Sequence, residues 1–391
     1  LPGQRRGKSL CRQKNSKTKY DNSQKIITFH KKYLMMSLTG NYYNTKLVNK
    51  MKLKILSCLL LCFFTLTNAA AAVMDPGLRY INARGKIKCG TNLSAPAYAS
   101  RDEEGMWKGF DVDICQAFSA AIFGSTEKFE MIDVRADQVG AALSTGQIDI
   151  MLGGQTLAAG ADVRGKAVPA GILYYDKQVF LGRQVSKANS LEDYRFATVC
   201  VVANSNDANN VEEFSNKHNL GLKMLSLNSE RRAKEAFLLN RCQLLSGNQI
   251  YLRGVWEENF QENPDVKIIP DVLALKPVYI LVAKDNPKLQ AISRWIVNAL
   301  QLAEMYGIDS RNVKVQIGLK NTSQRNLLGA NAKLWSGFGL RPEWIKQALA
   351  RIGNYGEIYE RNFGQYSNLK IDRAENRYLK DGGLLNPQPF L

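Results

Sequence analysis

The chain has 391 residues, with 53 Lys and Arg against 35 Asp and Glu and a formal net charge of +18. This length allows two domains with separate cores. The excess positive charge lies at the start, because residues 1–50 hold 12 Lys or Arg and one Asp, and the chain after Lys54 carries only +5. Composition therefore argues against a nucleic-acid-binding body, although the basic start of the chain could still contact an acidic partner.

Residues 51–72 have the three parts of a secretory signal peptide: a basic start at Lys52 and Lys54, an apolar run over residues 55–66, and small residues that offer Ala-x-Ala cleavage positions. The run is too short to span a membrane, and a buried core helix is the alternative. Because a signal peptide begins a translated chain, we expect Met51 to be the natural start and residues 1–50 to be a non-native or disordered leader. The chain is therefore predicted to be exported.

The first structured segment reads as strand, helix, strand. Residues 86–91 and 129–134 predict strands, and apolar residues recur at helical spacing from Ile114 to Ile122 after an acidic first turn. A unit of this length indicates a parallel sheet. A helix at 136–145 and a strand at 148–152 complete the pattern, and the strand ends at the loop Gly153-Gly154, where ligands collect in open α/β sheets.

Two extended apolar segments, 178–185 and 277–283, enclose a second α/β region. We predict strands at 196–202, 224–227, 244–248 and 267–270 and helices near 191–194, 211–218 and 229–240. Helices at 289–306 and after Pro342 follow the second crossing. Two crossings between α/β lobes predict a hinge. The expected lobes are residues 73–183 with 277–391, and residues 184–276.

Four cysteines follow the signal segment, and an even number in an exported chain indicates disulfides, with three possible pairings. Cys89 ends the first strand and Cys115 lies in the first turn of the next helix, whereas Cys200 ends a later strand and Cys242 precedes another. We predict the pairs Cys89–Cys115 and Cys200–Cys242. Zinc ligation is a weaker alternative, because there is no C-x-x-C spacing and His218 is the only His after the leader.

Several motifs resemble family 3 solute-binding proteins of ABC transporters. They are GFDVD at 109–113, LSTGQIDI at 143–150 and YYD at 174–176, and GNYGEIYERN at 353–362 is similar to the general L-amino-acid-binding subgroup. The resemblance covers about residues 77–391. It implies a two-lobed α/β fold of the type II periplasmic binding proteins, with two doubly wound sheets, a two-strand hinge and a helical C-terminal extension on lobe 1.

The implied function is that of a receptor in the periplasm, not an enzyme. It would capture an amino acid or related polar solute by lobe closure and deliver it to an ABC permease in the inner membrane, as a monomer and without a cofactor or metal. Two alternatives stay open: a degenerate receptor with an altered ligand or a protein-interaction role, and a dehydratase or cell-wall lytic enzyme on the same fold. No cleft loop shows an obvious His or paired carboxylates for such chemistry.

In lobe 1 the resemblance places three ligand contacts. Tyr98 follows the first strand and would cover the ligand with its ring, and Thr156 would offer a hydroxyl. The family's carboxylate-binding Arg has Ala161 at its ungapped position, so Arg164 is the nearest candidate. A surface Tyr and a surface Arg are the alternatives.

In lobe 2 the resemblance points to Ser205, Asn206 and Asn248. Ser205 and Asn206 lie in a polar turn, where helix capping is the alternative role. Asn248 stands where the subgroup has the Asp that holds the ligand ammonium. Because Asn is neutral, we predict weak binding of common amino acids and a gain from Asn248→Asp. The alternative is that Asp176 or Asp207 supplies the missing charge.

Overall fold

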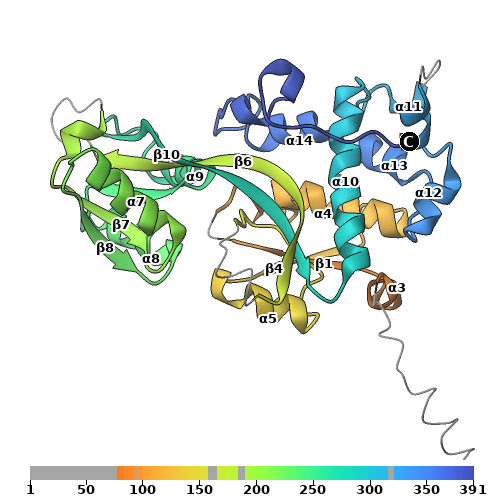
Figure 1. Cartoon of the computed structure of the whole chain (residues 1–391), viewed down its shortest axis with the longest axis horizontal. Coiled ribbons are helices and arrows are strands. Elements are labelled where there is room, and N and C mark those ends of the chain that lie inside the picture. Colours follow the sequence, from red (N-terminus) through yellow and green to blue (C-terminus); the bar gives the residue numbers. More distant parts are fainter. Residues whose placement is uncertain (1–76, 94, 157–164, 184–189, 316–320) are drawn as a thin grey trace, which may run out of the picture. The chain divides into compact units, whose positions relative to one another are not determined.

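The computed structural model describes residues 77–391 except 94, 157–164, 184–189 and 316–320. The leader and signal segment predicted at residues 1–72 lie outside the described residues. Figure 1 shows a mixed α/β arrangement in which a long, twisted strand pair runs between β7 and β8 at one end and α10 at the other.

Eight strands form one sheet in the order β4-β1-β5-β10-β6-β9-β7-β8, and a separate hairpin pairs β2 with β3. The parallel pairs β1–β4, β1–β5, β7–β8 and β7–β9 confirm the predicted α/β class. The strands are β1 (Ile87–Thr91), β2 (Ser100–Arg101), β3 (Trp107–Lys108), β4 (Phe129–Asp133), β5 (Ile150–Met151), β6 (Ala167–Arg183), β7 (Thr198–Val202), β8 (Lys223–Leu227), β9 (Leu244–Asn248) and β10 (Val266–Ala283).

The antiparallel pair β6–β10 joins two parts of this sheet. The first half comprises β4, β1 and β5 with residues 167–177 and 275–283, and the second half comprises β9, β7 and β8 with residues 178–183 and 266–274. The strands β6 and β10 are hydrogen-bonded to each other in both halves. The two sheets that were expected are therefore the two ends of one continuous sheet. The register breaks between Ile269 and Ala274, at the junction of the halves. Pro270 lies in this bulge, where its missing N–H breaks no ladder bond.

Helices cover the sheet, and several elements differ from expectation. The helix expected at 136–145 is a 3-10 turn followed by a helix at 139–144, and the strand expected at 267–270 and the crossing at 277–283 belong to the one strand β10. The helix expected near 211–218 begins at Asn206, because Ser205 caps it. The strand expected at 148–152 is only β5, and the helix after Pro342 begins at Trp344. The helices are α3 (Arg79–Arg84), α4 (Phe110–Phe123), α5 (Val139–Ser144), α7 (Asn206–Lys217), α8 (Glu230–Leu238), α9 (Gln249–Asn259), α10 (Pro287–Met305), α11 (Thr322–Leu327), α12 (Ala332–Gly337), α13 (Trp344–Ile352) and α14 (Tyr355–Asn362).

Short 3-10 turns link several of these elements, and one of them, at 191–194, is the short helix expected there. They are η1 (Ala136–Gln138), η2 (Leu191–Tyr194), η3 (Val313–Val315), η4 (Ala374–Asn376) and η5 (Leu379–Asp381).

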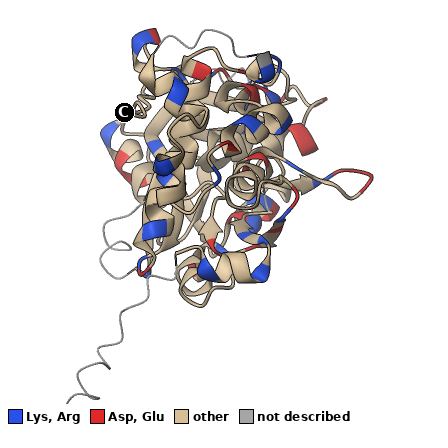
Figure 2. Cartoon of the chain, turned by 90° about the vertical axis from the view of Figure 1, so that its right-hand side faces the viewer, with Lys and Arg blue, Asp and Glu red and all other residues tan. Residues whose placement is uncertain are grey.

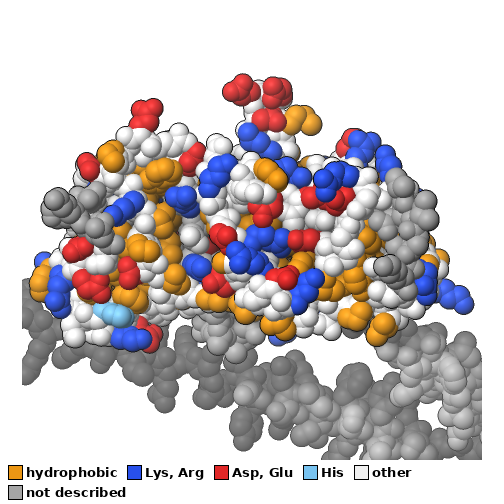
Figure 3. All heavy atoms as spheres, turned by 90° about the horizontal axis from the view of Figure 1, so that it is seen from above, with side chains coloured by type: hydrophobic (Ala, Val, Ile, Leu, Met, Phe, Trp, Pro, Cys, Tyr) orange, Lys and Arg blue, Asp and Glu red, His pale blue; other side chains and the backbone are white. Residues whose placement is uncertain are grey.

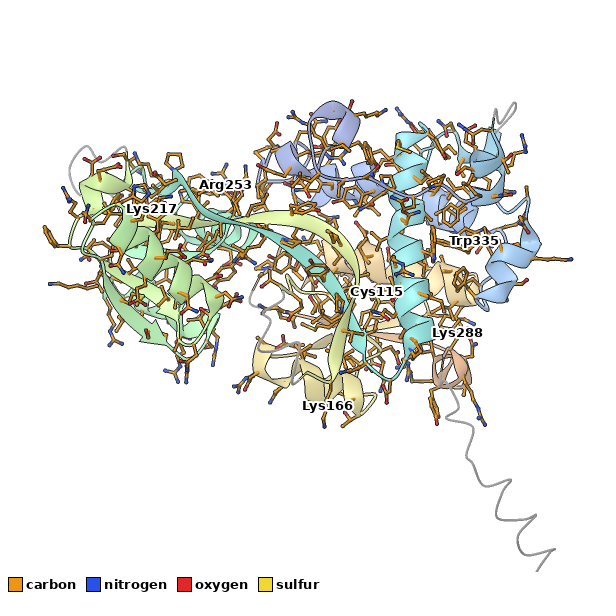
Figure 4. All side chains as sticks on the ribbon, viewed as in Figure 1. Cys115, Lys166, Lys217, Arg253, Lys288 and Trp335 are labelled. Atoms are coloured by element: carbon orange, nitrogen blue, oxygen red, sulfur yellow. A yellow bond between two sulfur atoms is a disulfide. The ribbon has the colours of Figure 1, made fainter. Side chains whose placement is uncertain are left out.

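Both predicted disulfides are present. Cys89 on β1 is bonded to Cys115 on α4, with Cα atoms 6.2 Å apart, and Cys200 on β7 is bonded to Cys242 just before β9, with Cα atoms 5.8 Å apart. All four residues are buried. Each bridge therefore fastens one half of the sheet internally, and Figure 4 labels Cys115 in the first half.

The C-terminal segment after α14 is anchored to the first half. Arg373 forms an ion pair with Glu304 on α10, and its guanidinium lies over the rings of Tyr355, Tyr359 and Tyr378. An ion pair that is shielded from water stabilises the fold only where further hydrogen bonds compensate for the lost hydration. One such bond runs from the Tyr378 hydroxyl to Glu304 Oε2 at 2.6 Å.

The same segment also touches the strand pair and the second half. Asn376 accepts a bond from the amide of Tyr175 at 2.7 Å and donates one to its carbonyl at 2.8 Å. Arg253, labelled on α9 in Figure 4, donates from Nε to the carbonyl of Leu369 at 3.0 Å. The C-terminal extension therefore holds β6 at the point where the halves join.

Charges of both signs are interspersed over the described residues rather than gathered. Figure 2 shows Lys and Arg mixed with Asp and Glu on one side, and Figure 3 shows the same mixture on another face. Within the described part of the chain, no helix is long and apolar enough to cross a membrane, and no three metal-binding side chains come together.

Candidate functional site

The loops at the carboxyl ends of β1 and β5 are joined by the buried carboxylate of Asp111. Its Oδ2 accepts hydrogen bonds from the Thr91 hydroxyl and the Gly153 amide, each at 2.7 Å. Burial raises the pKa of Asp111 to about 7, although these two bonds act in the opposite direction. Asp111 lies here because Gly109 begins α4 with φ 128°, and any side chain at Gly109 would collide with the backbone of Tyr98.

Tyr98 is part of an aromatic cluster rather than an exposed platform. Its ring centroid lies 6.5 Å from that of Tyr174 and 6.2 Å from that of Phe363, and only 2% of the residue is exposed. Its hydroxyl lies next to Gly154 and has no hydrogen-bond partner among the described residues. Burial and the charge of Asp176 both raise the pKa of Tyr98, so the phenol stays protonated and can donate.

Of the other two ligand contacts predicted in lobe 1, Thr156 and Arg164, the structure describes only Thr156. Thr156 is half-buried and follows the glycine loop, whose next residue, Gln155, accepts a 2.8 Å bond from the amide of Tyr279 on β10. Arg164 lies outside the described residues. Thr156 therefore lies two residues after Gly154, the residue next to the Tyr98 hydroxyl.

The polar turn before α7 has a capping role. The Ser205 hydroxyl accepts from the Ala208 amide at 3.1 Å and donates to the Val202 carbonyl at 2.6 Å, and Asn206 is the exposed first residue of the helix. Buried Gln178 on β6 ties this helix to the strand pair, since its amide donates to the Asp207 carbonyl at 2.9 Å and accepts from Asn210 at 2.7 Å.

Asn248 ends β9 and occupies the position before the first turn of α9. Its Oδ1 is buried without a partner among the described residues, and its side chain caps no helical amide. In the ladder Asn248 pairs with Gln178, two residues after Asp176. Alternate residues of a strand share one face, so Asp176 and Gln178 point the same way.

Asp176 is buried on β6 where the halves meet, with 2% of the residue exposed. Its Oδ1 accepts the Lys177 amide at 2.8 Å, whereas its Oδ2 has no hydrogen-bond partner among the described residues. Burial raises the pKa of Asp176 to about 7, and Lys276 and the backbone amides of Lys177, Ile250 and Gln249 oppose that rise.

Further charged groups surround this position. Lys276, directly opposite Asp176 on β10, forms a 2.8 Å ion pair with Asp207 at the start of α7. Glu230, the first residue of α8, accepts a 2.7 Å bond from Asn92 of the first half. Burial raises the pKa of Glu230, and Asn92 and Lys276 counter that rise while Asp207 adds to it. The junction thus holds three carboxylates around one ammonium.

Sequence reasoning missed Glu230, Lys276 and Asn92 and named Asp176 only as an alternative. A usable signal was present for Asp176 and Lys276 alone, because charged residues within the apolar crossing strands conflict with burial unless they are paired or functional. A surface hollow of about 360 Å³ lies elsewhere, lined by Val313, Lys314, Lys346, Gln347 and Ala350. It contains none of the predicted site residues.

Comparison with known families and sequences gives one consistent result. Residues 87–310, more than half of the chain, match the bacterial extracellular solute-binding proteins, family 3. The general L-amino acid-binding periplasmic protein AapJ of Rhizobium johnstonii is 29% identical over 87% of this chain and 99% of its own length. The glutamate/glutamine/aspartate/asparagine-binding protein BztA of Rhodobacter capsulatus is 26% identical over 82% of this chain and 94% of its own.

A solved structure with a similar fold carries a bound ligand. It is an ABC transporter periplasmic binding protein from Brucella ovis with glutathione bound, which is 31% identical, has a TM-score of 0.75, and aligns with 80% of this chain and 98% of its own. The alignment confirms the expected fold of type II periplasmic binding proteins.

Proposed function

Because the chain belongs to family 3 of the bacterial extracellular solute-binding proteins, we propose that it is a periplasmic receptor that captures a small polar solute between the two halves of its sheet and delivers it to an ABC permease. In this proposal the chain performs no chemistry on the solute. The observation that carries it is that two of the buried polar atoms without a hydrogen-bond partner among the described residues, on Asp176 and Asn248, lie at the junction. Such atoms are costly in a protein interior unless a ligand or water satisfies them.

The solute class we propose is an amino acid or a related compound with an amino group. The carboxylates of Asp176, Asp207 and Glu230 give the junction an excess of acceptors, which suits a cationic group. The names of the relatives from Rhizobium and Rhodobacter support amino acids. A short peptide is the second candidate, since the similar Brucella ovis structure contains glutathione.

Capture would occur by a hinge motion. The two strands β6 and β10 cross between the halves, and the bulge at 270–273 interrupts their ladder at that point. We propose that residues 73–183 with 277–391 form one lobe and residues 184–276 the other. The bond from Asn92 to Glu230 joins the two, so opening has to break it. A ligand that bridges the lobes would replace this contact by several.

The location and partners follow from the same proposal. The signal peptide at 51–72 would export the chain to the periplasm, an oxidising compartment that maintains the two disulfides. There the loaded receptor, a monomer, would dock on the permease of the inner membrane. Dehydratase or lytic chemistry on this fold remains the alternative class.

A thermal-shift screen with the proteinogenic L-amino acids and glutathione tests the proposal. A ligand bound only by the folded state raises stability by RT ln(1 + [L]/Kd), about 2.7 kcal/mol at a hundredfold excess over Kd. We expect at least one of these compounds to raise the melting temperature of the mature chain in a saturable way. No shift with any of them at millimolar concentration would reject a receptor for amino acids or glutathione.

A further inference from the structure

The C-terminal extension, α14 and the residues after it to 385, is fixed to the first half of the sheet by two charged contacts. Arg361 on α14 donates to the carboxylate of Asp113 on α4 at 2.7 Å. Arg373, further along the extension, forms its ion pair with Glu304 on α10. Since α4 and α10 both pack in the first half, the extension has to move with that half.

The extension also holds the strand pair at the place where the halves meet. The pairing of β9 with β6 starts at Gln178, and the side chain of Asn376 bonds to both backbone groups of Tyr175, three residues earlier. Asn376 is buried, and its neighbour Glu375 forms a 3.0 Å ion pair with Lys177. Asn376 therefore binds β6 as a strand partner would, on the side of the junction that belongs to the first half.

A third contact of the extension reaches the second half. Arg253 on α9 is half-buried, and its Nε donates to the carbonyl of Leu369 at 3.0 Å. The helix α9 begins directly after β9, so it moves with the second half. Leu369 is buried in the extension, where the amide of Ile371 bonds to the carbonyl of Phe363 at 2.9 Å. The bond from Arg253 therefore joins a helix of the second half to a segment fixed to the first.

We propose that the C-terminal extension is a brace that favours the arrangement of the halves in this structure over an opened one, with Arg253 and Leu369 as its contact on the second half. This inference rests on the proposed receptor function, because it concerns the hinge motion of capture. In the same arrangement Asn92 bonds to Glu230 on α8. Both α8 and α9 turn with the second half, so a rotation that parts Asn92 from Glu230 also displaces Arg253 from Leu369. A contact made in one state alone shifts the equilibrium toward that state.

The brace has a consequence for affinity. The apparent affinity of a receptor rises with the fraction of molecules that are already in the arrangement that binds. A single hydrogen bond of this kind changes such an equilibrium by about three- to ten-fold. Loss of the bond from Arg253 to Leu369 should therefore increase the opened population of the ligand-free protein by about that factor and weaken solute binding by no more than the same factor.

Two variants at one position separate the hydrogen bond from the charge. Arg253→Met keeps most of the side-chain length beside the ring of Trp256 but has no donor. Arg253→Gln has an amide nitrogen at the position of the arginine Nε, so it can still donate to the carbonyl of Leu369. Both variants lack the positive charge, and a difference between them therefore reports the bond alone.

Electron-spin distance measurements on the ligand-free mature chain test the proposal without a solute. The four native cysteines are in disulfides, so labels can be attached at Arg135→Cys and Arg231→Cys, exposed positions near Asn92 and Glu230. In the Arg253→Met background we expect the population at longer distance to rise by about three- to ten-fold over the labelled chain with Arg253. The Arg253→Gln background should stay close to that chain. Urea unfolding checks that each protein is folded.

The outcomes separate the brace from the receptor function. Equal distance distributions with Arg253 and with Arg253→Met overturn the brace, and so does an equal shift in Arg253→Met and Arg253→Gln, because the bond is then not its cause. Calorimetric titration of the unlabelled proteins with the proteinogenic L-amino acids and glutathione tests the receptor function separately. If none of these compounds binds the wild type, that function is rejected for them, while the distance measurement still decides the brace.

Discussion

Asp176 should destabilise the ligand-free protein at neutral pH, and its replacement by Asn should remove that cost. The carboxyl group has a pKa of about 7 in the folded chain against 3.8 for the ordinary group, and burial is the main cause. Below about pH 4 the group is protonated in both states and has no effect on stability. Between about pH 4 and pH 7 the unfolded chain has lost a proton that the folded chain keeps, so stability falls as the pH rises. Above pH 7 the cost is constant.

The size of the effect follows from the shift. A difference of about 3 pH units at about 1.36 kcal/mol per unit gives a cost of about 4 kcal/mol at pH 8, of which about 3 kcal/mol develops between pH 5 and pH 8. Asn has nearly the same shape and no charge to desolvate, and Lys276 keeps its ion pair with Asp207 in the variant. The stability gained by Asp176→Asn should therefore grow with pH.

Urea unfolding of the ligand-free wild type and variant at pH 5, 6, 7 and 8 measures this difference. Other titrating groups, including Asp111, contribute equally to both proteins and cancel. Asp265→Asn controls for the loss of one negative charge at an exposed position, and its effect should not vary with pH. A stability difference for Asp176→Asn that stays constant or shrinks as the pH rises would refute the reasoning.

Three further predictions follow from the structure. Replacing both cysteines of either disulfide by Ser should lower the free energy of unfolding, measured in urea, by about 2–5 kcal/mol. The two double variants are Cys89→Ser with Cys115→Ser and Cys200→Ser with Cys242→Ser. An unchanged unfolding midpoint would show that the bridge does not stabilise the fold. Binding of an amine-bearing amino acid should tighten as the pH rises through about 7 and release a proton, which calorimetry in buffers of different ionisation enthalpy detects; a pH-independent affinity would contradict it. Small-angle scattering should show a smaller radius of gyration with saturating ligand if the free lobes open at the 270–273 bulge, and an equal radius would argue for a free form that is already closed.

Much of the architecture could be predicted from local patterns. The strand at 87–91, the helix from Phe110 and both cysteine pairs depend on residues close in the sequence or on ordinary strand–helix geometry. The start of α7 was misplaced because the apolar pattern begins only at Val211, whereas the cap at Ser205 sets the first turn. Periodicity reports which face is buried, and capping reports where a helix begins, so the two can differ by a full turn.

The site was harder to predict, because it depends on pairings between distant strands. Lys276 is opposite Asp176 only through the β6–β10 register, and that register shifts at the bulge. No spacing in the sequence reveals that Lys276 reaches Asp207 or that Asn92 reaches Glu230. The sequence suggested Asp176 or Asp207 as a charge near Asn248, but only the strand pairing shows that Asp176 lies on the neighbouring strand, two residues from the partner of Asn248.

The location of that charge has a consequence for capture. Asn248 belongs to the second half of the sheet alone, whereas Asp176 lies on β6, which both halves share and which Asn376 holds in place from the C-terminal extension. A counter-charge on β9 would move with the second half during closure. A counter-charge on β6 stays on the strand pair that both halves share, and in this structure burial raises the pKa of Asp176 to about 7. On this reasoning the receptor holds Asp176 partly protonated at neutral pH, and an arriving ammonium group gains its partner by displacing that proton.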